Sequence, residues 1–243
     1  NSYYPDNENW GEATHEGVNN EAIPNYLLDL LDTVYNPNTN RGYMTRLFGE
    51  SSFDSLQITG DYVVVNVKES RVLDTYGSFS AIHIGYTAID LINIEGLQTI
   101  YGDHSIEDFK YGDKNQIFFS QYFIRNINSV YGGLSHTAGY GGSYMFGKKI
   151  KIGDEFYPIS PLGSFQNVGT VNFAVNPAST VYHEFSHNLF GGNPFHASGG
   201  NHRGSGEYMP FFGIQGGYGL MGAYRSGLVS CNGYERWRLR WKH

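Results

Sequence analysis

A short motif at residues 183–187, His-Glu-Phe-Ser-His, constrains this chain more than any other feature of its sequence. Two histidines four residues apart project from the same side of an α-helix, about one turn from each other. At this spacing two imidazoles can chelate one small tetrahedral cation such as Zn²⁺. Glu184 follows the first histidine, so it can lie beside the metal without binding it and serve as a general base. The motif therefore predicts a helix that carries a catalytic zinc site.

The residues around the motif also favour a helix. Asn176 is a good N-cap, and Pro177 suits the first helical position. The glycine pair at 191–192 is typical of a chain that has just left a helix. An apolar side chain recurs at every fourth residue: Val181, Phe185 and Leu189. The alternative interpretation is a pair of core histidines beside a surface glutamate, and the helix signals weigh against it.

A catalytic zinc ion takes three protein ligands and keeps one position open. His183 and His187 supply two ligands, and the candidates for the third are His196, His202 and Glu207. Glu207 lies twenty residues after His187, but glycine and proline around it make a poor helix. The glycine turn that follows the motif can bring His196 back beneath the metal. We therefore expect His196 to be the third ligand, with His202 and Glu207 as alternatives.

These residues together resemble a family. The zinc motif, the glycine turn, a third histidine and Met221, within Gly-Leu-Met-Gly-Ala-Tyr, are similar to a metzincin-type zinc peptidase. The ending 233–241, Gly-Tyr-Glu-Arg-Trp-Arg-Leu-Arg-Trp, resembles the segment that closes the catalytic domain of immune-inhibitor-A-like secreted peptidases. The resemblance covers about residues 176–241. It implies a zincin fold with an active-site cleft between an upper and a smaller lower subdomain.

The resemblance also assigns roles to two residues after the histidines. Met221 would be a hydrophobic floor beneath the zinc ligands, and Tyr224 would support the oxyanion, with Tyr218 or a loop histidine as alternatives. Two spacings depart from the family pattern. His196 comes three residues later than the usual third ligand, and Tyr224 follows Met221 by three residues rather than two. The chain is thus expected to be a variant or a separate branch.

The expected function is a zinc-dependent endopeptidase that acts on a protein or peptide substrate. Zinc activates a water, and Glu184 takes the proton from it and passes this proton to the leaving nitrogen. One alternative is a binding or adhesion module that keeps the zincin scaffold without proteolysis, in which surface tyrosines make the contacts. Another is a zinc hydrolase of a non-peptide amide or ester, because the motif specifies activated water and not the bond that it attacks.

Composition excludes several other classes. The net charge is −7 with 16 lysines and arginines, which makes nucleic acid an unfavourable partner. No apolar run reaches the length of a membrane span. The single cysteine, Cys231, excludes an internal disulfide. Twenty tyrosines, 16 phenylalanines and few charges suit a secreted, extracellular or cell-surface protein, here expected in a mature form without its signal peptide. An intracellular location is the alternative. A calcium loop at 4–11 is a weaker expectation, because it lacks alternating acids.

The local patterns predict an α+β chain. An amphipathic helix is expected at 23–35 and another at 87–97, where apolar residues follow helical spacing. Strands are expected over 49–67, at 117–127 as a central strand, and at 168–174 as an edge strand. The glycine-rich segments 132–147 and 213–222 are predicted to be loops that frame a cleft.

At 243 residues, one domain of two lobes is favoured. We expect an upper subdomain, 1–190, with a mixed sheet and the active-site helix. A smaller glycine-rich lower subdomain, 191–243, would follow it.

Overall fold

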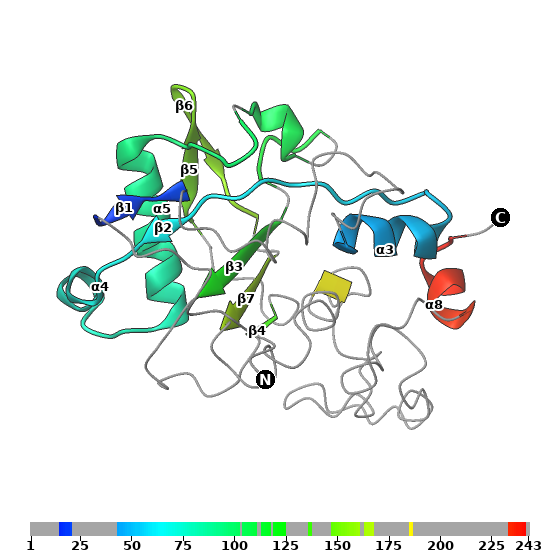
Figure 1. Cartoon of the computed structure of the whole chain (residues 1–243), viewed down its shortest axis with the longest axis horizontal. Helices are drawn as coiled ribbons and strands as arrows, with labels where there is room; N and C mark the ends of the chain where they lie inside the picture. The colour runs from blue at the N-terminus through cyan, green and yellow to red at the C-terminus, as the bar shows by residue number, and fades with distance from the viewer. Residues whose placement is uncertain are drawn as a thin grey trace.

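The chain has a mixed α/β architecture in a computed structural model (Figure 1). The structure describes residues 15–20, 43–102, 104–110, 113–117, 119–124, 136–137, 147–160, 163–167, 185–186 and 233–241. Its helices are α3 (Tyr43–Ser52), α4 (Glu69–Tyr76), α5 (Ala81–Glu95), the 3₁₀ helix η2 (Ile106–Asp108) and α8 (Gly233–Arg238). Its strands are β1 (Gly17–Val18), β2 (Val65–Asn66), β3 (Ser120–Ile124), β4 (His136–Thr137), β5 (Lys149–Ile152), β6 (Glu155–Pro158) and β7 (Gly163–Asn167). The predicted helix 23–35, the edge strand 168–174 and the calcium loop 4–11 lie outside these residues.

Helix α5 confirms the helix predicted at 87–97 and begins six residues earlier. Its start is the N-cap Ser80, whose side chain accepts a hydrogen bond from the backbone N–H of His83. It ends at Gly96, which has a φ of 93°. Among the helices that the structure describes, none combines the length and the apolar character needed to cross a membrane.

Helix α3 corrects the prediction of strands over 49–67. The helix continues to Ser52, and the only strand in that range is the two-residue β2. The buried side chains of Met44, Leu47 and Phe48 follow the i, i+3, i+4 spacing of a helical stripe. Their exposed fractions are 3%, 7% and 0%. The β-branched and aromatic residues that suggested strands lie mostly after the helix, in an extended segment.

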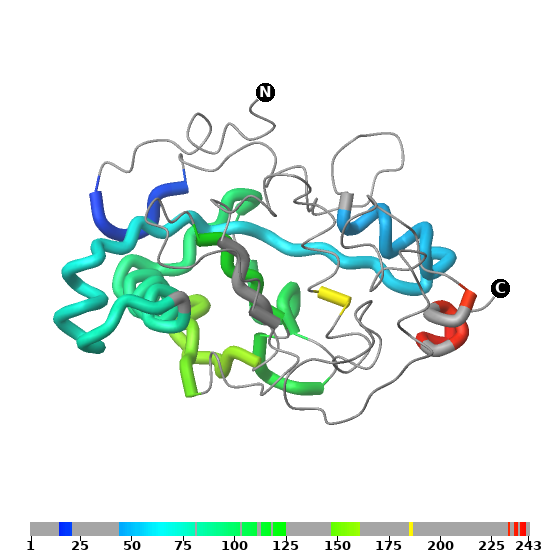
Figure 2. The backbone as a smooth tube through the Cα atoms, turned by 90° about the horizontal axis from the view of Figure 1, so that it is seen from below, coloured from blue at the N-terminus to red at the C-terminus, as the bar shows by residue number. Residues whose placement is uncertain are grey.

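That extended segment, 56–64, crosses the molecule from the turn after α3 to β2 (Figures 1 and 2). It forms isolated backbone hydrogen bonds with other segments instead of the continuous hydrogen-bond ladder of a strand. The carbonyl of Tyr62 accepts from the N–H of Ile100 at 2.9 Å, and that of Val64 accepts from Asn19 at 2.7 Å. Regular pairing begins only where β1 lies antiparallel to β2.

Three strands form a mixed sheet in the order β3-β7-β4. Strands β3 and β7 are parallel, and β4 pairs with β7 in the antiparallel sense. The strand predicted at 117–127 is present as β3, but within the described residues β7 holds the central position. Strand β4 lies inside the glycine-rich segment 132–147, which was predicted to be a loop. Its pairing with β7 overrides a composition that disfavours strands.

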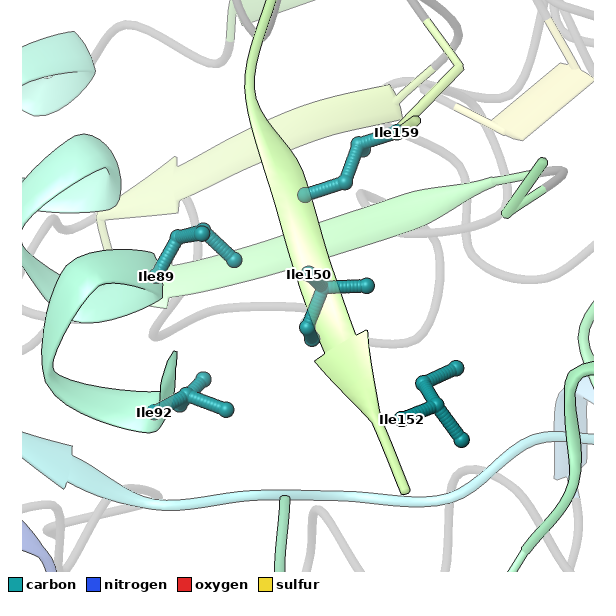
Figure 3. Close-up of a cluster of buried hydrophobic side chains, with 5 residues drawn as sticks. All are labelled: Ile89, Ile92, Ile150, Ile152 and Ile159. Atoms are coloured by element: carbon teal, nitrogen blue, oxygen red, sulfur yellow. The ribbon is translucent and has the colours of Figure 1, made fainter. Parts of the chain in front are cut away.

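The core between α5 and the β5–β6 hairpin is built from isoleucines. Ile89 and Ile92 of α5 lie against Ile150 and Ile152 of β5 and against Ile159 (Figure 3). Burial of each such side chain stabilises the fold by about 1.5–3 kcal/mol relative to exposure. The hairpin turn begins at Gly153, whose φ of 61° suits the first central position of a type II′ turn. Together these contacts join the longest described helix to the hairpin.

Because of Tyr122 in β3, we expect the folded protein to lose stability at alkaline pH. Burial raises the pKa of its phenol to about 12, from an ordinary value of about 10. Between these pH values the unfolded chain loses the proton and the folded chain keeps it. Stability is therefore complete below about pH 10 and falls as the pH rises towards 12, by about 2–3 kcal/mol from this residue.

The measurement is denaturant unfolding at about pH 8 and about pH 11, with Tyr122→Phe as the comparison. The variant has no phenol to ionise, so the same pH step should cost it less stability than it costs the wild type. Equal losses in both proteins would contradict a role for Tyr122.

Candidate active-site helix

Two residues of the zinc motif lie in the described part of the chain. Phe185 and Ser186 are helical, as the motif requires. The side chain of Phe185 is 5% exposed and that of Ser186 is fully buried. Phe185 and Ser186 of the motif thus face the protein core, and the other two residues of the predicted apolar stripe, Val181 and Leu189, lie outside the described residues.

Phe185 packs edge-on against two aromatic rings. Its ring centroid lies 5.1 Å from that of Phe48, at an interplanar angle of 61°. It lies 4.9 Å from that of Phe119, at 72°. Such T-shaped pairs are favourable beyond the area that they bury. Residues 185–186, yellow in Figure 1, therefore lie between α3 and the start of β3. We call these three rings the phenylalanine cluster.

Helix α3, which supplies Phe48, is held at its C-terminal end by α8. The Nε of Arg236 donates a hydrogen bond to the carbonyl of Ser51 at 3.0 Å. A cation at this end of a helix also interacts favourably with the helix dipole. The guanidinium lies 5.0 Å from the ring centroid of Phe53, in cation–π geometry.

Phe53 follows the last residue of α3 and, together with Asp54, has a positive φ, at 55° and 59° respectively. These two residues form a left-handed turn. This turn ends the helix, because a right-handed α-helix cannot continue through residues with positive φ. The turn and Arg236 of α8 thus meet at the same end of α3. The segment 233–241, which carries part of the family resemblance, therefore contacts α3, the helix whose Phe48 packs against Phe185 of the motif.

Sequence reasoning missed the residues that support the motif helix. Phe48 lies just before the range 49–67 in which strands were predicted, and Phe119 lies within the predicted strand 117–127. Helical spacing within 43–52 was the available signal for Phe48. No local signal pointed to Arg236, because its partners Ser51 and Phe53 lie more than 180 residues earlier in the chain.

The remaining predicted site residues lie outside the described part of the chain. This applies to the base Glu184, to the Met221 floor and to the oxyanion candidates Tyr218 and Tyr224. It applies equally to every candidate zinc ligand: His183, His187, His196, His202 and Glu207. Across the residues that the structure does describe, no three His, Cys, Asp or Glu side chains are grouped so as to hold a metal ion.

A separate histidine–carboxylate cluster was not expected from the sequence. The Nε2 of His104 is hydrogen-bonded to Asp61, whose side chain is fully buried. Asp61 also accepts from the backbone N–H of Tyr101 at 3.0 Å. The Nδ1 of His104 lies 3.5 Å from Asp108. Both ring nitrogens therefore face carboxylates, and the histidine links the segment around Asp61 to η2.

Asp108 has its own local role at this link. The backbone N–H of Ser105 holds the pKa of the Asp108 carboxyl below its ordinary value. Ser105 and Asp108 form a capping box at the start of η2. The sequence Ser-Ile-Glu-Asp contained that signal, but the partner Asp61 is brought to His104 only by the fold.

Comparisons with known proteins returned no relative. No protein-family model, no curated protein and no solved structure matches this chain.

Proposed function

We propose that this chain is the catalytic domain of a secreted zinc endopeptidase of the zincin class, with the motif helix at its active site. The observation that supports this most directly is the burial of Phe185, in helical conformation, against Phe48 and Phe119. This burial is what a helix at the motif requires, with one side packed on the core. The metzincin-type and immune-inhibitor-A-like resemblance adds to the proposal.

Helix geometry connects this burial to a metal site. Successive residues of an α-helix are rotated by about 100°, so the positions two before and two after a residue project from its opposite side. If the helix extends over the whole motif, positions 183 and 187 would project away from the phenylalanine cluster. A metal held there would have to be reachable by substrate from that side. Two imidazoles there, with His196 as the third, would form a nitrogen donor set that suits zinc.

The roles of the protein groups follow from their chemistry. Zinc in such a site acts as a Lewis acid and lowers the pKa of water towards neutrality. Glu184 accepts the proton of the attacking water and delivers it to the departing amine. Tyr224 donates a hydrogen bond to the carbonyl oxygen as negative charge develops on it. In the family resemblance Met221 would be an apolar support under the imidazoles and would take no part in proton transfer.

Zinc content and proteolysis test the proposal together. The purified chain should carry a single zinc ion by metal analysis and should cleave unfolded casein. A zinc chelator should lower the cleavage rate by at least about a hundredfold, because the chemistry depends on the metal. Added zinc should restore the rate.

Each other outcome has a clear meaning. Zinc without cleavage would favour the binding or adhesion module over the peptidase. Zinc with hydrolysis of simple esters or amides, but not of casein, would favour the non-peptide hydrolase. Absence of bound zinc, together with a rate that the chelator does not change, would contradict the proposed function.

A further inference from the structure

The last described segment of the chain, 233–241, is rich in positive charge and tryptophan. Four of the 16 lysines and arginines fall within residues 236–242, Arg-Trp-Arg-Leu-Arg-Trp-Lys, and no acidic residue interrupts them. Two of the three tryptophans, Trp237 and Trp241, lie in the same stretch. The chain as a whole has a net charge of −7. An acidic protein thus carries a short stretch that is locally cationic and aromatic.

Helix α8 holds the exposed part of this stretch at one end of the molecule. It lies at one end of the long axis in two perpendicular views (Figures 1 and 2). Trp237 is 64% exposed, and Arg240, directly after the helix, is exposed as well. Because Arg236 donates to the carbonyl of Ser51 and lies over the ring of Phe53, α8 is anchored on α3. The indole and the guanidinium are therefore presented to solvent from a fixed base.

Two backbone hydrogen bonds close the end of α8. The N–H of Arg240 donates to the carbonyl of Trp237 at 3.1 Å, and the N–H of Trp241 donates to the carbonyl of Arg236 at 2.9 Å. This pair of bonds is a common way for a helix to end, and it needs a left-handed residue at the position of Arg240. Arg240 has a φ of 60°. The exposed indole and the exposed guanidinium thus belong to a single turn.

Arginine is an unusual residue for the left-handed position of this turn. Glycine is the usual one, because a side chain costs energy in that region of φ and ψ. Asn and Asp adopt it more readily than other residues, since a short polar side chain can bond locally, but arginine has no such side chain. The chain therefore keeps a long cation where local stability favours glycine. Such an outlier is a reason to look for a function, and recognition of an anion outside the chain would account for it.

We propose that the turn formed by Trp237 and Arg240 binds the surface of a membrane that contains anionic lipids. The negative potential of the lipid head groups attracts a guanidinium near the surface. Tryptophan prefers the boundary between head groups and hydrocarbon, because its ring is apolar and its N–H is polar. The acidic remainder of the chain extends away from this end of the molecule, so salt screens its repulsion from the bilayer.

The proposal does not depend on the zinc site, because neither residue belongs to the motif or to its candidate ligands. A chelator that removes zinc should therefore leave membrane binding unchanged.

Flotation or sedimentation of the full chain with lipid vesicles tests this. The chain should bind vesicles of phosphatidylglycerol and phosphatidylcholine in equal parts. It should bind phosphatidylcholine vesicles at least about tenfold more weakly, because the attraction of the cations is lost. Trp237→Ala should weaken binding to the anionic vesicles about tenfold, since a large apolar side chain no longer leaves water. Added salt should weaken binding as well.

Arg240→Gly separates membrane binding from stability. Loss of one cation near an anionic surface should weaken vesicle binding about fivefold. Glycine suits the left-handed position, so this variant should unfold at the temperature of the wild type or slightly above it. Lys114→Gln is the matched control, because it removes one exposed cation from a different segment. It should leave vesicle binding unchanged.

The proposal is overturned if the wild type does not bind anionic vesicles, if it binds neutral vesicles equally well, or if Arg240→Gly and Lys114→Gln have the same effect. A second copy of the chain is the other occupant that the test detects. Size-exclusion chromatography would then show a dimer that Trp237→Ala abolishes, together with no vesicle binding, and this result would also overturn the proposal.

Discussion

Replacement of Glu184 by glutamine should abolish peptide-bond cleavage while zinc remains bound. Glutamine has nearly the same shape but cannot accept a proton, so the general base is lost and the histidine ligands are kept. General bases commonly contribute about 10²–10⁴-fold to the rate, and we expect a loss of kcat in this range. The measurement is the rate of cleavage of unfolded casein, with metal analysis of the same sample.

Glu69→Gln is the matched control for this substitution. Glu69 is an exposed glutamate in the first turn of α4, and the same chemical change there should leave both the rate and the zinc content unaltered. A Glu184→Gln variant with wild-type activity would end the peptidase proposal. Loss of zinc together with activity would instead make Glu184 a structural or ligand residue.

Replacement of Phe48 by alanine should be the most destabilising of the changes considered. Phe48 is fully buried and contacts Phe185 at the centre of the motif helix. Removal of a buried phenylalanine ring usually costs about 3–5 kcal/mol, because both the transfer energy and the packing around the cavity are lost. For a chain of this size the melting temperature should fall by roughly 10 °C. Calorimetry or denaturant unfolding measures the change.

Phe156→Ala provides the comparison, because Phe156 is 55% exposed on β6. Its loss should change the stability by less than about 0.5 kcal/mol. Phe48→Leu should be much more stable than Phe48→Ala. If the phenylalanine cluster supports the motif helix, Phe48→Leu should also bind zinc more tightly than Phe48→Ala. Equal effects of Phe48→Ala and Phe156→Ala would contradict the role of the phenylalanine cluster.

Local periodicity accounts for what could be predicted of the fold. The apolar spacing in α5 and the β-rich composition of β3 are properties of short segments, so each was visible without the rest of the chain. Helix α3 carried the same kind of signal, in Met44, Leu47 and Phe48, but the β-branched residues after it obscured its end. A two-residue strand such as β4 has no periodicity of its own and exists because β7 lies beside it.

The candidate site, like the fold, has features that local sequence predicts and features that depend on contacts between distant segments. Residue types and spacing alone determined that the motif at 183–187 is suited to a helix and to zinc, because metal chelation depends on which donors lie one helical turn apart. Only the tertiary structure decided that Phe48 of α3 and Phe119, just before β3, pack against Phe185, and that Arg236 of α8 holds the end of α3. These contacts join residues between 66 and 185 positions apart. No short-range pattern encodes them, because packing between distant segments depends on how the whole chain closes on itself.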